Sequence, residues 1–149
     1  MNWQRDEYLL TDDRTRLDLD AVWVWLQSSY WAAERSRAVV EKSLEGSMCF
    51  GLFHGNVPVG FARAVTDHAT FAYIADVVID PEHRGRGLGK WMMECVVNHP
   101  GLAGQTLLLR TRDAHGLYER FGFERMECLK MTAGQGTKGG FEGDIQERG

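Results

Sequence analysis

The stretch from Asp80 to Lys90 constrains this chain more than any other segment, because it places glycines and cations where a strand meets a helix. Residues 71–79, rich in Val, Ile, Tyr and Phe, predict the strand, and residues 88–99 carry a helical pattern. The glycines are Gly85, Gly87 and Gly89, and the cations are Arg84, Arg86 and Lys90. Glycine lets backbone N–H groups approach a ligand closely, and the start of a helix attracts anions. The stretch therefore predicts a phosphate or pyrophosphate site, with a glycine-rich turn that binds nothing as the alternative.

Two common phosphate-binding patterns do not fit this stretch. The Walker pattern would need glycine at position 84 and Ser or Thr at position 91, where the chain has Arg84 and Trp91. The dinucleotide-binding fingerprint would need a third glycine at position 90, where the chain has Lys90. The sequence therefore predicts neither a P-loop nor a Rossmann-type site.

The remaining pattern resembles motif A of the GNAT superfamily of acetyl-CoA-dependent N-acetyltransferases. It consists of Arg84-x-x-Gly87-x-Gly89 preceded by Val77-Val78-Ile79-Asp80-Pro81. The resemblance implies acetyl-CoA as cosubstrate and no metal. It also implies that the backbone of Val77, Val78 and Ile79 pairs with the pantetheine amides, an N–H near Val78 polarising the acetyl carbonyl. The residues that it implies for the pyrophosphate are Arg84, Gly85, Arg86, Gly87, Leu88, Gly89 and Lys90.

The segment Ala114–Phe123 carries a second resemblance, because GNAT enzymes commonly show Ala-x-x-Leu-Tyr-x-x-x-Gly-Phe there. The resemblance places Tyr118 near the coenzyme sulfur as general acid for the departing thiolate. Packing is the alternative role for Tyr118, since it lies on an apolar helical stripe. The family's Asn, three residues before Ala114, is Thr111 in this chain, which departs from the pattern.

Asp76 is the first candidate for the base that deprotonates the acceptor amine, because it lies on the strand beside the expected acetyl position. The alternative is a structural carboxylate paired with an arginine such as Arg63. Tyr73 is the second candidate, and strict strand alternation places it on the opposite face from Asp76. By resemblance Tyr30 and Trp31 are candidates for the acceptor pocket, with plain packing as the alternative.

Length and composition limit the cellular setting. A chain of 149 residues suits one domain, and its net charge of −4 does not suggest a nucleic-acid surface. No apolar run reaches membrane-spanning length, and the first residues are too polar for a signal peptide. Three scattered cysteines favour free thiols in a reducing compartment over disulfides or a metal site. We therefore expect a cytoplasmic protein.

The expected fold is α/β: the GNAT (acyl-CoA N-acyltransferase) fold, with a mixed central sheet, splayed parallel strands and helices on both faces. Residues 1–131 form the predicted domain, and the glycine-rich residues 132–149 a mobile tail in which Phe141 and Ile145 could still dock a final strand. Predicted strands cover residues 8–11, 48–53, 57–65, 71–79, 106–110 and 123–131. Predicted helices begin after Asp18 or Asp20 and cover residues 32–45, 88–99 and 114–121. In the first helix Leu19, Val22, Trp23, Leu26 and Tyr30 are expected to face the core, with Val24 and Trp25 off that stripe.

Together these observations predict an N-acetyltransferase that transfers the acetyl group of acetyl-CoA directly to a primary amine, with a small molecule as the acceptor. A non-catalytic CoA-binding sensor of the same fold is the alternative, and a different acyl donor is a third. The resemblance is also compatible with a homodimer.

Overall fold

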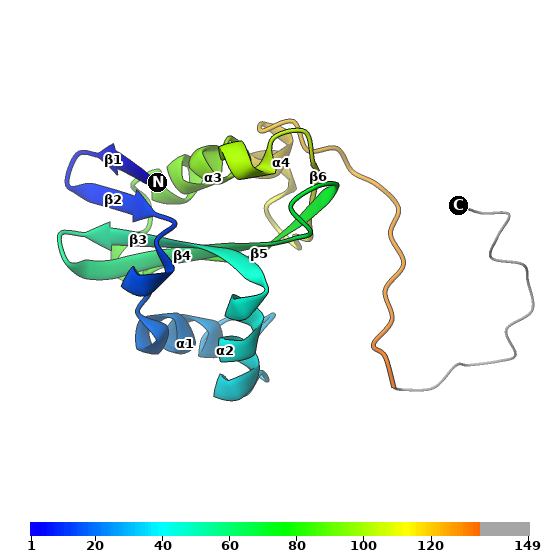
Figure 1. Ribbon diagram of the computed structural model, residues 1–149, viewed down its shortest axis with the longest axis horizontal. Helices are drawn as coiled ribbons and strands as arrows, with labels where there is room; N and C mark the ends of the chain where they lie inside the picture. The colour runs from blue at the N-terminus through cyan, green and yellow to red at the C-terminus, as the bar shows by residue number, and fades with distance from the viewer. Residues whose placement is uncertain (135–149) are drawn as a thin grey trace, which may run out of the picture.

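The computed structural model describes residues 1–134, which form a three-layer α/β arrangement (Figure 1). Within these described residues, six strands follow one another across a single sheet in chain order. Neighbouring strands are antiparallel except the last pair, β5 and β6, which are parallel. The strands are β1 (Asn2–Arg5), β2 (Tyr8–Thr11), β3 (Ser47–His54), β4 (Val57–Thr66), β5 (Phe71–Ile79) and β6 (Thr106–Leu109). This is the mixed α/β sheet that the sequence predicts, with β1 as an additional strand at its edge.

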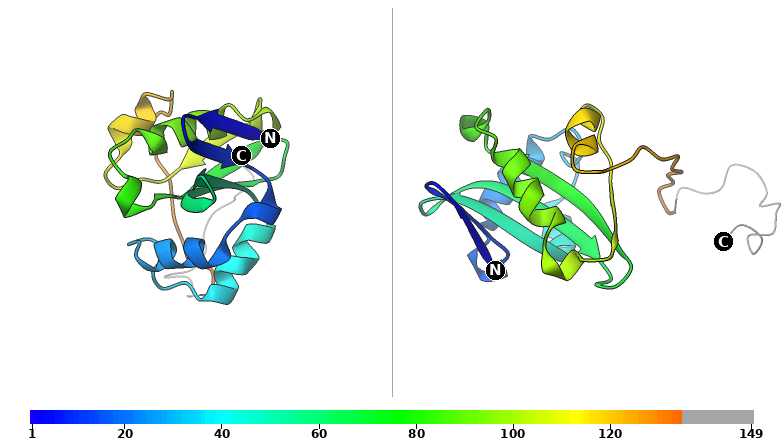
Figure 2. Two further views of the ribbon diagram at one scale, coloured as in Figure 1. Left: turned by 90° about the vertical axis from the view of Figure 1, so that its left-hand side faces the viewer. Right: turned by 90° about the horizontal axis from the view of Figure 1, so that it is seen from above.

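Helices cover both faces of the sheet, as the two further views also show (Figure 2). The helices α1 (Leu19–Gln27) and α2 (Arg37–Glu45) lie on one face, while α3 (Leu88–Val97) and α4 (His115–Glu119) lie on the other. One buried cluster lies between the sheet and α3, and the other joins α1 and α2 to Phe61 of β4. The two clusters give the sheet an apolar core on each side.

Capping residues account for where the first two helices begin. The Asp18 carboxylate accepts a hydrogen bond from the Ala21 N–H at 3.0 Å and begins α1. The Ser36 hydroxyl accepts one from the Val39 N–H at 3.2 Å, so α2 begins at Arg37 rather than at residue 32 as predicted. Residues 28–36 are therefore a loop between the two helices.

The buried face of α1 differs from the predicted stripe. Its buried side chains include Trp25, which lies off the predicted stripe, whereas Tyr30, which belongs to that stripe, is exposed. The Trp25 indole N–H donates to the Asp80 carboxylate at 3.0 Å, and this long-range polar contact holds the ring inward. Helical periodicity alone could not show that contact.

A β-bulge interrupts β5 at the centre of the sheet. Arg63 of β4 pairs with Ala75, but Phe61 pairs with Val78, so β5 contains one extra residue. Asp76 occupies the bulge with φ of +55°. The bulge moves the following side chains to the other face, because Ile74 belongs to the cluster beneath α3 and Val78 to the cluster beneath α1 and α2. Strict alternation predicted that Tyr73 and Asp76 lie on opposite faces of the sheet. Because the bulge at Asp76 interrupts the alternation, that prediction is wrong.

The parallel strands β5 and β6 separate after a short pairing. Their register runs from Phe71 opposite Thr106 to Ile74 opposite Leu109, where β6 ends while β5 continues to Ile79. Residues 75–79 are therefore not paired with β6 along the edge that faces away from β4. The resemblance to the GNAT superfamily implies this splayed pair.

The predicted strand over residues 123–131 does not form. These residues are irregular, and Figure 1 shows them leading away from the sheet. Their apolar side chains Met126, Leu129 and Met131 are exposed and belong to neither apolar cluster, so the segment buries no apolar stripe against the sheet. The tail predicted from residue 132, with Phe141 and Ile145, lies outside the described residues apart from its first three positions. No helix in residues 1–134 is both long and apolar enough to cross a membrane.

Candidate active site

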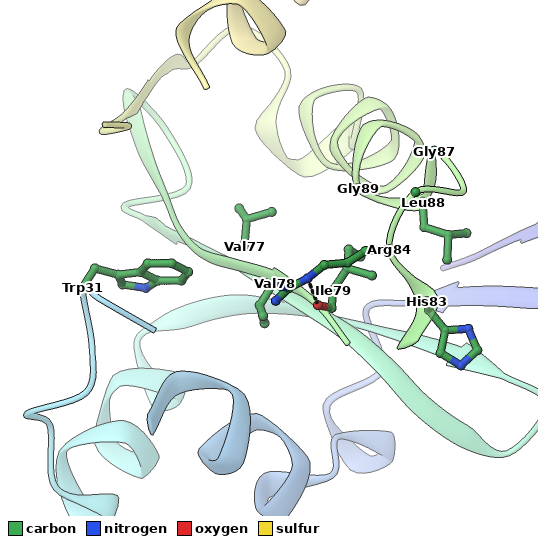
Figure 3. A pocket seen from close by; sticks show the side chains of 10 residues that line it. Trp31, Val77, Val78, Ile79, His83, Arg84, Gly87, Leu88 and Gly89 are labelled. Atoms are coloured by element: carbon green, nitrogen blue, oxygen red, sulfur yellow. Dashed lines mark hydrogen bonds between the residues drawn. The ribbon is translucent and has the colours of Figure 1, made fainter. Parts of the chain in front are cut away.

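A cavity of about 320 Å³ lies where β5 leads into the glycine-rich loop (Figure 3). The predicted site residues that line it are Val77, Val78, Ile79, Arg84, Gly85, Gly87, Leu88 and Gly89. His83 and Trp31 complete its wall. The structure thus brings most of the predicted cofactor-binding residues together around one hollow.

The start of the loop is fixed by Asp80. One carboxylate oxygen accepts a hydrogen bond from the Trp25 indole N–H, and the other accepts one from the Glu82 N–H at 2.9 Å. The hydrogen bond from Trp25, followed by the one from Glu82, lowers the pKa of the Asp80 carboxyl, so the anion persists at neutral pH. The Arg84 Nε atom then donates to the Ile79 carbonyl at 3.0 Å, which folds the loop back along the end of β5.

The loop meets the conditions for holding an anion. Gly85 and Gly87 have φ of +79° and +74°, which glycine adopts without the strain that other residues incur. Gly87 is the N-cap residue of α3, and no side chain from residues 1–134 caps that helix end. The N–H groups of the first helical turn therefore remain available to phosphate oxygens, and the helix dipole favours a negative charge there.

The predicted cations take different positions. Arg84 lines the cavity, whereas Arg86 and Lys90 lie outside its lining. The Arg86 guanidinium donates to the Tyr8 hydroxyl at 3.0 Å, so β2 holds this side chain. Arg5 approaches from β1 and donates to the Gly87 carbonyl at 3.2 Å, a contact that sequence patterns did not indicate.

A second, larger cavity of about 1160 Å³ extends between β5, β6 and the loop at residues 28–36. Tyr118, Asp76 and Tyr73 line it, as do Tyr30 and Trp31. Two residues, Trp31 and Val77, line both cavities. The glycine-rich loop and Tyr118 therefore belong to neighbouring hollows that share a wall.

Tyr118 has the protonation state that an acid requires. Its side chain is half-buried on α4 and packs against Phe123, with ring centroids 6.0 Å apart. Burial, followed by the Coulombic effects of the Tyr30 phenol and the Asp113 carboxylate, raises the pKa of the Tyr118 phenol above its ordinary value. The hydroxyl consequently keeps its proton at neutral pH. The Thr111 hydroxyl accepts a hydrogen bond from the Ala114 N–H at 3.0 Å and so supports the segment that leads into α4.

Asp76 is held by three donor side chains. The Arg63 Nε atom donates to Oδ2 at 2.6 Å, and Arg35 Nη1 donates to both carboxylate oxygens at 2.9 Å. The Trp31 indole N–H donates to Oδ1 at 2.9 Å. Burial by itself would raise the pKa of the Asp76 carboxyl, but the hydrogen bond and charge of Arg63, together with Arg35, hold it below its usual range.

These contacts correspond to the structural alternative for Asp76, in which Arg63 is its partner. Sequence reasoning missed Arg35 and Trp31, although an acidic residue inside a strand indicates that cationic partners must be found in the fold. A low pKa and three donors make this carboxylate a weak proton acceptor.

A model of the acetyltransferase (GNAT) family matches residues 2–123 of the chain. The chain belongs to the GNAT family of acetyltransferases. A provisionally named acetyltransferase of Gibberella zeae is 33% identical over 169 aligned positions, covering 92% of this chain and 95% of that protein.

Solved structures agree with this assignment. A GNAT-family protein from Xanthomonas campestris, also provisionally named an acetyltransferase, has a TM-score of 0.81 and 37% identity, covering 89% of this chain and 98% of that one. A GNAT acetyltransferase from Elizabethkingia anophelis, solved with acetyl-CoA bound, shares the fold at a TM-score of 0.65 and 12% identity, covering 83% and 80% of the two chains. GNAT enzymes use acetyl-CoA, and the uncapped start of α3 with its glycine-rich loop fits the diphosphate of that molecule.

Proposed function

We propose that this GNAT acetyltransferase transfers the acetyl group of acetyl-CoA directly to a primary amine on a small molecule. The observation that carries the proposal is the sharing of Trp31 and Val77 between the two cavities. A thioester that extends from the glycine-rich loop reaches this shared wall, and Tyr118 lies in the cavity beyond it. An amine that enters the larger cavity can meet the thioester there.

The residues support one direct displacement. The amine loses its extra proton to water, and its lone pair forms a bond to the acetyl carbonyl carbon. The carbon–sulfur bond breaks with its electron pair on sulfur, and sulfur takes a proton from the Tyr118 hydroxyl. The nitrogen releases its second proton, which restores Tyr118 through solvent. The products are the N-acetylated amine and CoA, with one net proton released.

The role of Asp76 in this scheme is to position other side chains. Its pKa lies below the usual range, whereas a base for an ammonium group needs a pKa nearer to neutrality. The amine therefore passes its proton to water in the larger cavity, to which Tyr73 also contributes.

Titration calorimetry with acetyl-CoA, followed by thiol release with a panel of small primary amines, tests the proposal. We expect the wild type to bind acetyl-CoA and to release CoA with at least one amine. Tyr118→Phe should retain binding but lose about 100-fold or more in kcat, the range for general acids. Trp23→Phe, at a residue that lines neither cavity, is the control and should retain both binding and rate. Binding without turnover for every amine would instead support a CoA sensor.

A further inference from the structure

We propose that Trp31 sets the length of the acyl group that this enzyme accepts, and that Asp76 is the positioning residue that holds the Trp31 ring in place. This inference rests on the proposed function, because it concerns the acyl donor of the same reaction. It assigns a role to two residues that the transfer steps do not use directly.

The position of Trp31 is the first part of the argument. Its indole lies in the wall shared by the two cavities, and Figure 3 shows the ring extending toward Val77. An acyl group attached to a thioester at this boundary has the indole on one side and β5 on the other. Atoms added beyond the acetyl methyl must therefore pass the ring or displace it.

The second part is that the ring is held by a rigid acceptor. The Asp76 carboxylate, which accepts from the Trp31 N–H, belongs to a residue that is only 4% exposed. The hydrogen bonds from Arg63 and Arg35 occupy the same two oxygens, so the carboxylate cannot turn away without losing them. Rotation of the indole consequently breaks a hydrogen bond to a buried anion.

The third part is that the two residues on either side of Trp31 are held by contacts of their own. Ala32, the next residue, is buried, and its N–H donates to the Ser29 hydroxyl at 3.1 Å. Tyr30 packs edge-on against the Trp31 ring with centroids 5.1 Å apart. The Arg112 guanidinium lies 3.8 Å from the centre of the Tyr30 ring and connects this loop to the segment before α4. Trp31 is 38% exposed, so these contacts and the hydrogen bond to Asp76, rather than burial, oppose its displacement by a larger group.

A fixed ring discriminates by steric exclusion. A pocket that is sensitive to one methylene separates two substrates by about 10- to 200-fold. We therefore expect the wild type to prefer acetyl-CoA over propionyl-CoA by about tenfold or more, and over butyryl-CoA by more again.

The test measures kcat/KM with one responsive amine, and Kd by calorimetry, for acetyl-, propionyl- and butyryl-CoA. Trp31→Ala should raise the propionyl-to-acetyl ratio by about tenfold. Trp31→Phe keeps an aromatic ring but loses the N–H, and should give an intermediate ratio. Trp23→Ala is the matched control, because Trp23 is partly buried in the cluster of α1 and α2 and lines neither cavity. Its ratio should remain that of the wild type.

Asp76→Ala, which removes the acceptor of the Trp31 N–H, tests the positioning role, and Arg35→Ala provides a second variant if the first does not fold. Both should raise the propionyl-to-acetyl ratio in the direction of Trp31→Ala while the pH dependence of kcat/KM keeps its shape. A catalytic base would instead remove the acidic limb of that profile and leave the ratio unchanged.

The outcomes separate the two proposals. If acetyl-CoA binds and turns over but Trp31→Ala keeps the wild-type ratio, the inference on acyl length is overturned and the proposed function stands. A changed ratio in Trp31→Ala with an unchanged ratio in both Asp76→Ala and Arg35→Ala overturns the positioning role. If the wild type binds none of the three thioesters, the proposed function fails and the inference fails with it.

Discussion

The replacement Asp76→Asn should destabilise the fold more than any ordinary surface substitution. The Asp76 side chain is 1% exposed, and its main partner, the Arg63 side chain, is 11% exposed. Asparagine has nearly the same shape and can still accept one hydrogen bond, but it leaves two arginines without their counter-charge. Removing one partner of a buried ion pair costs about 3–5 kcal/mol. Arg35, whose side chain is 28% exposed, stays partly solvated, which places the expected loss near the lower end, about 3 kcal/mol.

Urea unfolding followed by circular dichroism measures this loss. With an m-value of about 2 kcal/mol/M, the midpoint should fall by about 1.5 M. Asp113→Asn, at an exposed position in the wall of the same larger cavity, is the control and should shift the midpoint by less than about 0.3 M. A midpoint for Asp76→Asn within that margin of the wild type would refute the view that this ion pair stabilises the fold.

The stabilisation that Asp76 contributes should also depend on pH in a definite direction. The folded-state pKa of the Asp76 carboxyl is depressed, so its contribution is fully present above the unfolded pKa of about 4. The contribution is lost as the pH falls through the lower, folded-state value. The difference in unfolding free energy between wild type and Asp76→Asn should therefore be constant from neutral pH down to about pH 5 and shrink below about pH 4.

Three further changes should have separable effects. Gly87→Ala places a side chain at a positive φ, so it should lower the unfolding free energy by about 1–2 kcal/mol and weaken acetyl-CoA binding in a calorimetric titration. Gly46→Ala is the control, because an added Cβ there has nothing within 4 Å, and it should leave binding unchanged. Tyr118→Phe should remove any alkaline limb of the pH–rate profile, and in the wild type that limb should lie above about pH 10, because burial raises the pKa of the phenol. Asp18→Ala removes the cap of α1 and should lower the unfolding free energy by about 1 kcal/mol in urea, while Asp18→Asn, which can still cap, should retain most of it.

Local chemistry explains why much of the fold could be predicted from the sequence. The strand at residues 71–79 and the start of α3 follow from apolar pattern and glycine placement, and both are confirmed. The predicted start of α2 at residue 32 was wrong, because Ser36 caps the helix and the apolar pattern does not show that cap. The predicted strand at residues 123–131 failed for a different reason. Phe123 alone among its residues has a high strand propensity, and the exposed side chains of Met126, Leu129 and Met131 have no surface to pack against.

The sequence by itself determined the family, the glycine-rich loop and the tyrosine after β6, since each depends on residues that are close together along the chain. The tertiary structure decided what surrounds them. The bulge in β5 turns Asp76 toward Trp31 and Arg35, which lie more than forty positions earlier. The contacts of a buried charge depend on which distant segments the fold brings beside it, because the low-dielectric interior penalises any carboxylate that lacks such partners.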